Sequence, residues 1–289
     1  MPVEPPVVSP HTLAEALDAV ADGRTRPIAG GTDLMVALTG ELGEPPERVV
    51  DLWGLDELRG ITVGGDGIVL GALTTYTEIR RSALCREHLP GLVEAAATIG
   101  AAQIQNRGTL GGNIANASPA GDTLPVLLAL DASFVLVSVR GERTVPSSAF
   151  WTAYRQTALA PDELVARIEV PFARGREIRF RKVGTRRAQS ISKVVMAVAW
   201  RDGAGAGAQT HEWRDVRVAA GSVAATPVRA AATEAAMEGR APNPETADLA
   251  AETLAGELHP IDDVRSTAEY RRVVAARVLH RIIREAGGW

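Results

Sequence analysis

Cysteine is nearly absent from this sequence of 289 residues, which contains only Cys85. One thiol cannot form a disulfide within the chain. An iron–sulfur cluster takes about four thiolates, so this chain alone cannot hold one. The five histidines lie far apart, and none has a second ligand at the spacing typical of a metal site. We therefore predict no metal centre in this chain and expect Cys85 to be a partly buried apolar side chain.

The sequence also lacks a strong excess of charge, a block of basic residues and a long hydrophobic run. Its net charge is −4 and its isoelectric point is near 5.8, which provides no basic field for a nucleic-acid partner. No apolar stretch is long enough to span a bilayer, and the opening MPVEPPVVSP lacks the features of a secretory signal. We expect no nucleic-acid partner, no membrane partner and a cytoplasmic location.

What the sequence does contain is typical of a globular protein with a substantial core. Hydrophobic residues make up 46% of the chain, and the length suffices for two ordinary domains. The apolar pattern predicts helices over residues 10–22 and 90–106, a hairpin around residues 64–67, and strands over residues 134–139, 162–172 and parts of 176–230. Within the last range, Gly203–Gly207 is expected to be a flexible connection. This mixture predicts an α+β protein with a domain boundary near residues 174–177.

A further helix is predicted over residues 266–286. Ser266 and Glu269 stand at capping-box spacing at its start. Its apolar side chains recur at helical spacing and are expected to face a core; they include Tyr270, Val273, Val274, Leu279 and Ile282.

The stretch RPIAGGTDLMVAL, which begins at Arg26, joins the end of a buried strand to the start of a helix. The turn between them contains Gly30 and Gly31, and two interpretations of it remain open. The unpaired amides and the dipole of a helix N-terminus suit a phosphate, and glycines let it approach. Alternatively, Thr32 or Asp33 caps the helix while the glycines supply unusual backbone angles. A short glycine motif does not decide between them.

Residues 103–130, QIQNRGTLGGNIANASPAGDTLPVLLAL, form the most informative segment. Four glycines punctuate a stretch rich in Thr, Asn and Ser that carries little charge. A solvated connection normally carries Lys or Glu, so we expect this segment to bind a polar ligand. Asp122 is expected to cap the helix that follows, with Pro125 in its first turn, so that a second helix N-terminus points at the ligand.

Three motifs follow one another along the chain: AGGTDL, QI-x-N-x-G-T-x-GGNIANASPAGD and SISKV. Together they resemble the FAD-binding medium subunits of molybdenum hydroxylases such as xanthine dehydrogenase and carbon monoxide dehydrogenase. The order of these motifs matches over nearly the whole chain. The resemblance implies a vanillyl-alcohol-oxidase-type (PCMH-type) FAD-binding domain over residues 1–174, with two subdomains that divide near residues 55–60. It also implies a C-terminal α+β domain over residues 175–289.

The resemblance further implies roles for individual positions, all of them toward FAD. The loop that wraps the pyrophosphate matches Ile28, Ala29, Gly30, Gly31, Thr32, Asp33 and Leu34. The second phosphate and flavin loop matches Thr109, Gly112, Asn113 and Asn116. Asp122 matches an acid at the adenosine half, Ile99 an apolar position against the cofactor, and Leu164 a residue near the adenine or flavin. Lys193 matches a lysine near the isoalloxazine, where a cation stabilises negative charge on the reduced ring.

Some positions depart from the family pattern or stand outside it. Only two of the 31 basic residues are lysines. Lys182 is expected to lie, together with Arg186-Arg187, on a solvated or subunit-facing rim. Relatives usually have an arginine where this chain has Gln105, so a local ion pair is expected to be missing. The segment Gln189-Ser190 lacks the acidic residue that many relatives carry, so the electron acceptor does not follow from the resemblance.

The family mechanism implied by this resemblance carries electrons from a substrate oxidised at a molybdenum centre, through iron–sulfur clusters, to FAD and then to NAD or another acceptor. An iron–sulfur small subunit and a molybdopterin large subunit would then be separate chains. Two alternatives stay open: a free-standing FAD-dependent dehydrogenase or oxidase that acts directly on a small molecule, and a scaffold that has lost its cofactor. FAD carries its own redox chemistry, so no catalytic side chain is predicted.

Overall fold

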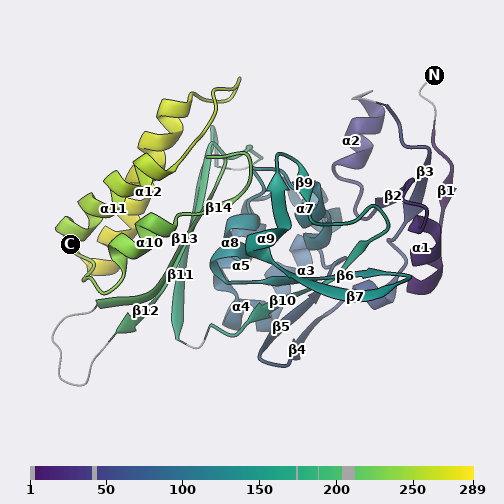
Figure 1. Ribbon diagram of the computed structural model, residues 1–289, viewed down its shortest axis with the longest axis horizontal. Coiled ribbons are helices and arrows are strands. Elements are labelled where there is room, and N and C mark those ends of the chain that lie inside the picture. Colours follow the sequence, from purple (N-terminus) through teal and green to yellow (C-terminus); the bar gives the residue numbers. More distant parts are fainter. Residues whose placement is uncertain (1–3, 41–43, 174, 188, 204–211) are drawn as a thin grey trace.

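The N-terminal part of the chain forms a small parallel sheet with one helix packed on it and a second helix that projects beyond it, shown in purple in Figure 1. The computed structural model describes residues 4–40, 44–173, 175–187, 189–203 and 212–289. The sheet has the order β1-β3-β2, and its elements are β1 (Val7–Val8), α1 (Leu13–Val20), β2 (Thr25–Ile28), α2 (Leu34–Thr39) and β3 (Arg48–Asp51). The hydroxyl of Thr12 caps α1 by accepting from the amide of Glu15, and the apolar face of α1 packs on the sheet.

A five-stranded antiparallel sheet with helices packed on it forms the middle of the molecule (Figure 1). A short 3-10 helix, η1 (Asp56–Leu58), leads into it. The strand order is β4-β5-β10-β6-β7, with β4 (Ile61–Gly64), β5 (Gly67–Gly71), β6 (Ser133–Ser138), β7 (Gly141–Pro146) and β10 (Leu164–Pro171). The predicted hairpin is confirmed, because Gly64 pairs with Gly67 at the β4–β5 turn.

The helices of this middle part come mainly between β5 and β6. They are α3 (Tyr76–Arg81), α4 (Ala83–His88), α5 (Pro90–Thr98), α6 (Ala102–Arg107), α7 (Leu110–Asn116), α8 (Leu124–Ala129) and, after β7, α9 (Ser147–Phe150). The single helix predicted over residues 90–106 is wrong. Gly100 has φ +51°, a left-handed conformation that ends the helical path, so α5 and α6 are separate helices.

The C-terminal part is a second antiparallel sheet with three helices on its outer face (Figure 1). The strands follow the order β11 (Arg176–Val183), β12 (Val194–Gly203), β13 (Glu212–Gly221) and β14 (Val228–Arg229), and the helices are α10 (Ala231–Met237), α11 (Pro244–Glu257) and α12 (Ala268–Gly287). Alternate residues of β12 serve two cores: Val194 and Met196 pack with the helices, whereas Val195 and Ala197 pack with the middle of the molecule. The sheet is therefore buried on both faces.

Two details of the last helix differ from the sequence-based expectation. The N-cap of α12 is Thr267, whose hydroxyl accepts from the amide of Tyr270, so the predicted capping box at Ser266 is wrong. Leu279 and Ile282 are buried as expected, but Tyr270 and Val273 are 42% and 41% exposed. The buried apolar face of α12 is therefore narrower than the sequence pattern indicated. Of the expected connection Gly203–Gly207, residues 204–207 lie outside the described part of the chain.

Across the described ranges, none of the helices combines the length and the apolar composition that a membrane span requires.

Candidate functional site

The first glycine-rich loop lies between β2 and α2, as the sequence predicted. Gly31 has φ +76°, a conformation that strains residues with a Cβ. Asp33 occupies the N-cap position of α2, but its side chain makes no capping hydrogen bond. The carboxylate of Asp33 instead accepts from the side-chain amide of Asn116, with 3.0 Å between Oδ1 and Nδ2. The capping alternative therefore does not explain this residue.

The second glycine-rich loop is organised by Thr109, which caps α7. Its hydroxyl accepts from the amide of Gly112 at 3.1 Å. The amide of Gly111 donates to the carbonyl of Ala72, and a Cβ on Gly111 would lie 2.6 Å from the Cβ of Ala72. The side chain of Asn113 accepts from the hydroxyl of Thr123 at 2.6 Å. The contact with Ala72, directly after β5, holds the loop close to the sheet, and the other two bonds order the loop itself.

The two loops meet although 83 residues separate Asp33 from Asn116. A Cβ on Gly30 would lie 1.8 Å from the carbonyl oxygen of Arg107, at the end of α6. A Cβ on Gly112 would come within 4.0 Å of the Cβ of Ala29. These glycines therefore let the main chains of the two loops lie close together. Backbone amides from both loops can then reach one ligand.

A stacked arginine lies beside this junction. The guanidinium carbon of Arg107 lies 3.7 Å from the centroid of the Trp53 ring, and the guanidinium carbon of Arg59 lies 4.6 Å from the same ring. Trp53 follows β3, which is parallel to the strand that leads into the first loop. The aromatic ring thus ties the start of the second loop to the N-terminal sheet. Sequence reasoning did not identify Trp53.

Asp122 is buried, but it does not cap α8. Thr123 occupies the N-cap position, and Pro125 lies in the first turn as expected. The carboxylate of Asp122 accepts from Lys182 Nζ at 2.6 Å, from Thr98 Oγ1 at 3.4 Å, and from the hydroxyl of Ser192. Burial raises the pKa of the Asp122 carboxyl, and these three donors oppose the rise. The predicted cap is wrong because a cation 60 residues away binds the carboxylate more strongly than the helix amides do.

Lys182 lies in a different environment from the one that the sequence predicted. Lys182 does not lie on a solvated rim: its side chain is 8% exposed and also donates to the carbonyl of Thr98 at 3.1 Å. Lys193 is partly exposed, and its ammonium lies 5.0 Å from the centroid of the Tyr270 ring. The position of Lys193 near the flavin stays a prediction. The rarity of lysine in this chain was the available signal for Lys182.

Ile99 and Leu164 lie in different parts of the core. Ile99 lies in the turn between α5 and α6 and packs on the core of the middle part. Leu164, at the start of β10, is 3% exposed and belongs to the N-terminal core, against which Ala29 also packs.

Gln105 compensates for the expected missing arginine. Its amide donates to the carbonyl of Ile99 at 2.9 Å and accepts from the guanidinium of Arg80.

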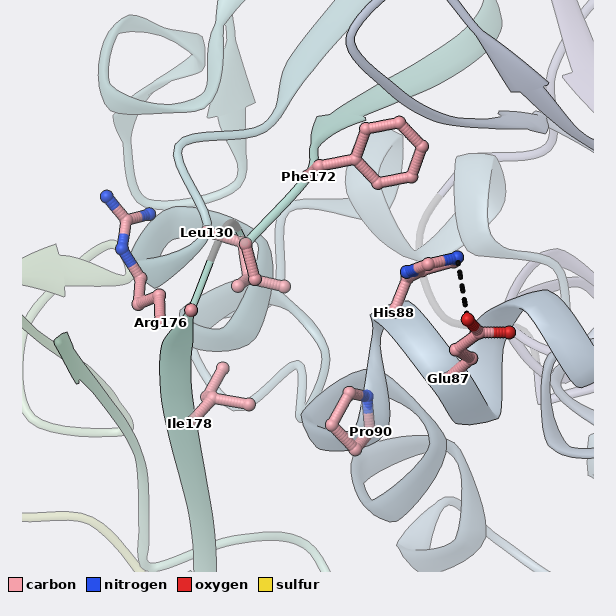
Figure 2. A pocket seen from close by; sticks show the side chains of 9 residues that line it. Glu87, His88, Pro90, Leu130, Phe172, Arg176 and Ile178 are labelled. Carbon is pink, nitrogen blue, oxygen red and sulfur yellow. Dashed lines mark ion pairs between the residues drawn. The ribbon is translucent and has the colours of Figure 1, made fainter.

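A cavity of about 540 Å³ lies elsewhere, between α4, α5 and the start of β11 (Figure 2). The ring of His88 meets that of Phe172 edge-on, with 5.0 Å between centroids, and Glu87 lies 3.7 Å from the imidazole Nε2. Arg176 also lines the cavity but pairs with Asp215. None of the predicted cofactor residues lines this cavity, so it is separate from the two glycine-rich loops.

Two family models together match nearly the whole chain. Residues 2–173 match the model of the FAD binding domain in molybdopterin dehydrogenase, and residues 179–286 match the CO dehydrogenase flavoprotein C-terminal domain. The chain belongs to the FAD-binding medium subunits of the molybdenum hydroxylases. The cofactor of this medium subunit is FAD, and the subunit is part of an oxidoreductase.

Individual relatives cover nearly the full length of this medium subunit. The glyceraldehyde dehydrogenase medium chain of Sulfolobus acidocaldarius is 32% identical over 98% of this chain and 99% of its own. The xanthine dehydrogenase FAD-binding subunit of Escherichia coli O157:H7 is 30% identical over 95% of this chain and 93% of its own. A structure of carbon monoxide dehydrogenase from Hydrogenophaga pseudoflava matches with a TM-score of 0.91 at 31% identity, covering 97% of this chain and 96% of that one. The predicted fold class is confirmed.

Proposed function

We propose that the diphosphate of FAD lies against the two glycine-rich loops, residues 28–34 and 109–116, and that main-chain amides bind it. The observation that carries this proposal is the junction of the loops: the Asp33–Asn116 hydrogen bond and the close approach of Gly30 to Arg107. Gly30 and Gly112 carry no Cβ where the main chains approach, which suits an anion bound by backbone donors. The residues present therefore fit the cofactor.

Asp122 is assigned to the adenosine half, as the resemblance implied. A carboxylate accepts hydrogen bonds from ribose hydroxyls. The bond from Lys182 holds Asp122 in place and joins it to β11, so the C-terminal sheet positions this acid. We also propose that the two domains divide between residues 174 and 175, in keeping with the ranges of the two family matches.

Bound FAD supplies redox chemistry that can take electrons singly from iron–sulfur clusters and pass them in pairs to a two-electron acceptor. We propose that the chain works as an electron-transfer subunit beside an iron–sulfur small subunit and a molybdopterin large subunit. The acceptor is NAD or another oxidant. The names of the relatives support this, because they are medium chains or FAD-binding subunits of dehydrogenases.

Purification of the native complex tests this proposal. FAD, iron and molybdenum that elute together with this chain, in fixed ratios, support the electron-transfer subunit. A preparation that contains FAD but no metal, and that oxidises a small substrate alone, supports the free-standing dehydrogenase instead. A chain that takes up no FAD even when offered an excess contradicts both. Addition of NAD to the dithionite-reduced complex, with the flavin absorbance followed, tests the acceptor.

A further inference from the structure

A short hairpin that sequence reasoning missed lies against the second glycine-rich loop. It consists of β8 (Trp151–Ala153) and β9 (Gln156–Thr157). The indole N–H of Trp151 donates to the carbonyl of Ile114 in α7 at 3.1 Å, and this bond is buried. The turn of the hairpin holds Arg155 with φ +53°, a left-handed conformation that few residues other than glycine, asparagine and aspartate adopt. The hairpin is therefore anchored, and its turn is strained.

The side chain of Arg155 lies where the two glycine-rich loops join. One guanidinium nitrogen donates to the side-chain oxygen of Asn116 at 2.9 Å. The amide nitrogen of Asn116 in turn donates to Asp33. Asn116 thus links Arg155 to both loops, and the remaining donors of the guanidinium are not used by Asn116. Within the described part of the chain, Arg155 forms no ion pair with a carboxylate.

The charges around the two loops show why Arg155 matters for an anionic ligand. Asp33 is the one charged side chain within residues 28–34 and 109–116, and it is acidic. Lys182 is engaged by Asp122, and the guanidinium of Arg107 is stacked on Trp53. A diphosphate placed at the loop junction would therefore meet the Asp33 carboxylate, with Arg155 as the cation held there by the neutral side chain of Asn116. Guanidinium groups bind phosphate oxygens through paired hydrogen bonds.

We propose that Arg155 binds the diphosphate of FAD and supplies the positive charge that the two loops lack. This inference rests on the proposed placement of FAD between the loops. Arg155 lies outside both loops, on the β8–β9 hairpin. The strained turn is then explained, since it holds the guanidinium over the loop junction while Trp151 fixes the base of the hairpin.

Titration of flavin-free protein with FAD and with riboflavin, followed by flavin fluorescence, tests the proposal. Riboflavin has the isoalloxazine but no phosphate. The main variant is R155N, because asparagine tolerates the left-handed backbone without the charge. We expect R155N to weaken FAD binding about 10–100-fold, the range for loss of a charged hydrogen bond, and to leave riboflavin binding unchanged. R155K, which keeps the charge but not the fork, should fall between the two proteins. The control is R277Q, which removes an exposed arginine of the C-terminal helix α12.

Each other result overturns the proposal in a recognisable way. Unchanged FAD affinity in R155N, with wild type binding FAD normally, shows that Arg155 does not contact the diphosphate while the loop site stands. Equal losses for FAD and riboflavin show that the variant disturbs the site as a whole. An equal loss in R277Q shows a general effect of positive charge. If wild type binds no FAD, the proposed function fails together with this inference. Far-UV circular dichroism of each variant establishes that it is folded.

Discussion

The carbonyl oxygen of Arg107 occupies the space that a Cβ on Gly30 would need, 1.8 Å from the position of that atom. The carbonyl belongs to the main chain, and a Cβ is attached directly to it. Neither atom can therefore move away by rotation of a side chain. The contact joins the loop after β2 to the end of α6. It makes Gly30, more than its neighbour Gly31, the residue on which the approach of the two loops depends.

We therefore expect G30A to purify with most of its FAD lost. The added methyl group must push the loops apart, and amides displaced from the diphosphate no longer bind it. FAD released by acid and measured by absorbance gives the occupancy per chain. The control is G54A, since a Cβ at Gly54 has no neighbour within 4 Å and its φ is unstrained. Full occupancy in G30A would contradict the placement of the diphosphate.

The two lysines of this chain offer a matched pair of variants. K182M leaves the Asp122 carboxylate buried without its ammonium partner, and such a loss costs about 3–5 kcal/mol. K193M removes a partly exposed cation from the ring of Tyr270, which costs about 0.5–1 kcal/mol. Urea unfolding of both variants measures these free energies. A cost in K182M as small as the one expected for K193M would show that the pair with Asp122 does not join the C-terminal sheet to the FAD-binding part.

Local signals predicted much of the fold and of the glycine-rich loops. The hairpin at Gly64–Gly67, the helix after Thr12 and the turn at Gly30–Gly31 depend on residues close together in the sequence, and each is found where expected. The break at Gly100 was missed because apolar residues continue at helical spacing on both sides of it. One left-handed glycine outweighed that pattern.

Contacts over long sequence distances account for the rest of the differences. Asp122 looked like a helix cap, since its neighbours are the amides of α8, and nothing in the local sequence shows that Lys182 and Ser192 reach it from the C-terminal sheet. Lys182 looked solvent-exposed for the same reason. Arg155 was missed because the hairpin that carries it is short and its partner, Asn116, lies 39 residues earlier.

Substitutions can test whether Gln105 interacts directly with Arg80 in the middle part of the molecule. Its side chain bridges Arg80 and the carbonyl of Ile99. Q105R places a second guanidinium beside the first in a buried position, so we expect it to destabilise the protein by about 1–3 kcal/mol, the cost of unsatisfied buried polar groups. The double variant R80Q/Q105R reverses donor and acceptor and should recover most of the loss. Thermal unfolding of the single and double variants measures the coupling. Additive effects would contradict a direct Arg80–Gln105 interaction.

Glu163 makes the stability of the FAD-binding part depend on pH. Its side chain is 5% exposed and accepts from Arg143 Nε at 2.7 Å and from the amide of Ala160 at 2.8 Å. The hydrogen bonds from Arg143 are the main reason why the pKa of Glu163 lies below its usual value of 4.5. A carboxyl with a lowered pKa stabilises the folded state above the pKa of the unfolded chain, and that stabilisation disappears as the pH falls through the folded value.

E163Q should consequently cost about 1.5–3 kcal/mol at neutral pH, the contribution of hydrogen bonds to a charged group. The difference from wild type should shrink steadily below pH 4.5, where the wild-type carboxyl also takes up a proton. Urea unfolding at a series of pH values measures the difference. E94Q, on the exposed face of α5, is the control for the loss of a surface carboxylate. A cost for E163Q that does not change with pH would mean that the shape of the glutamate, and not its charge, holds the turn before β10.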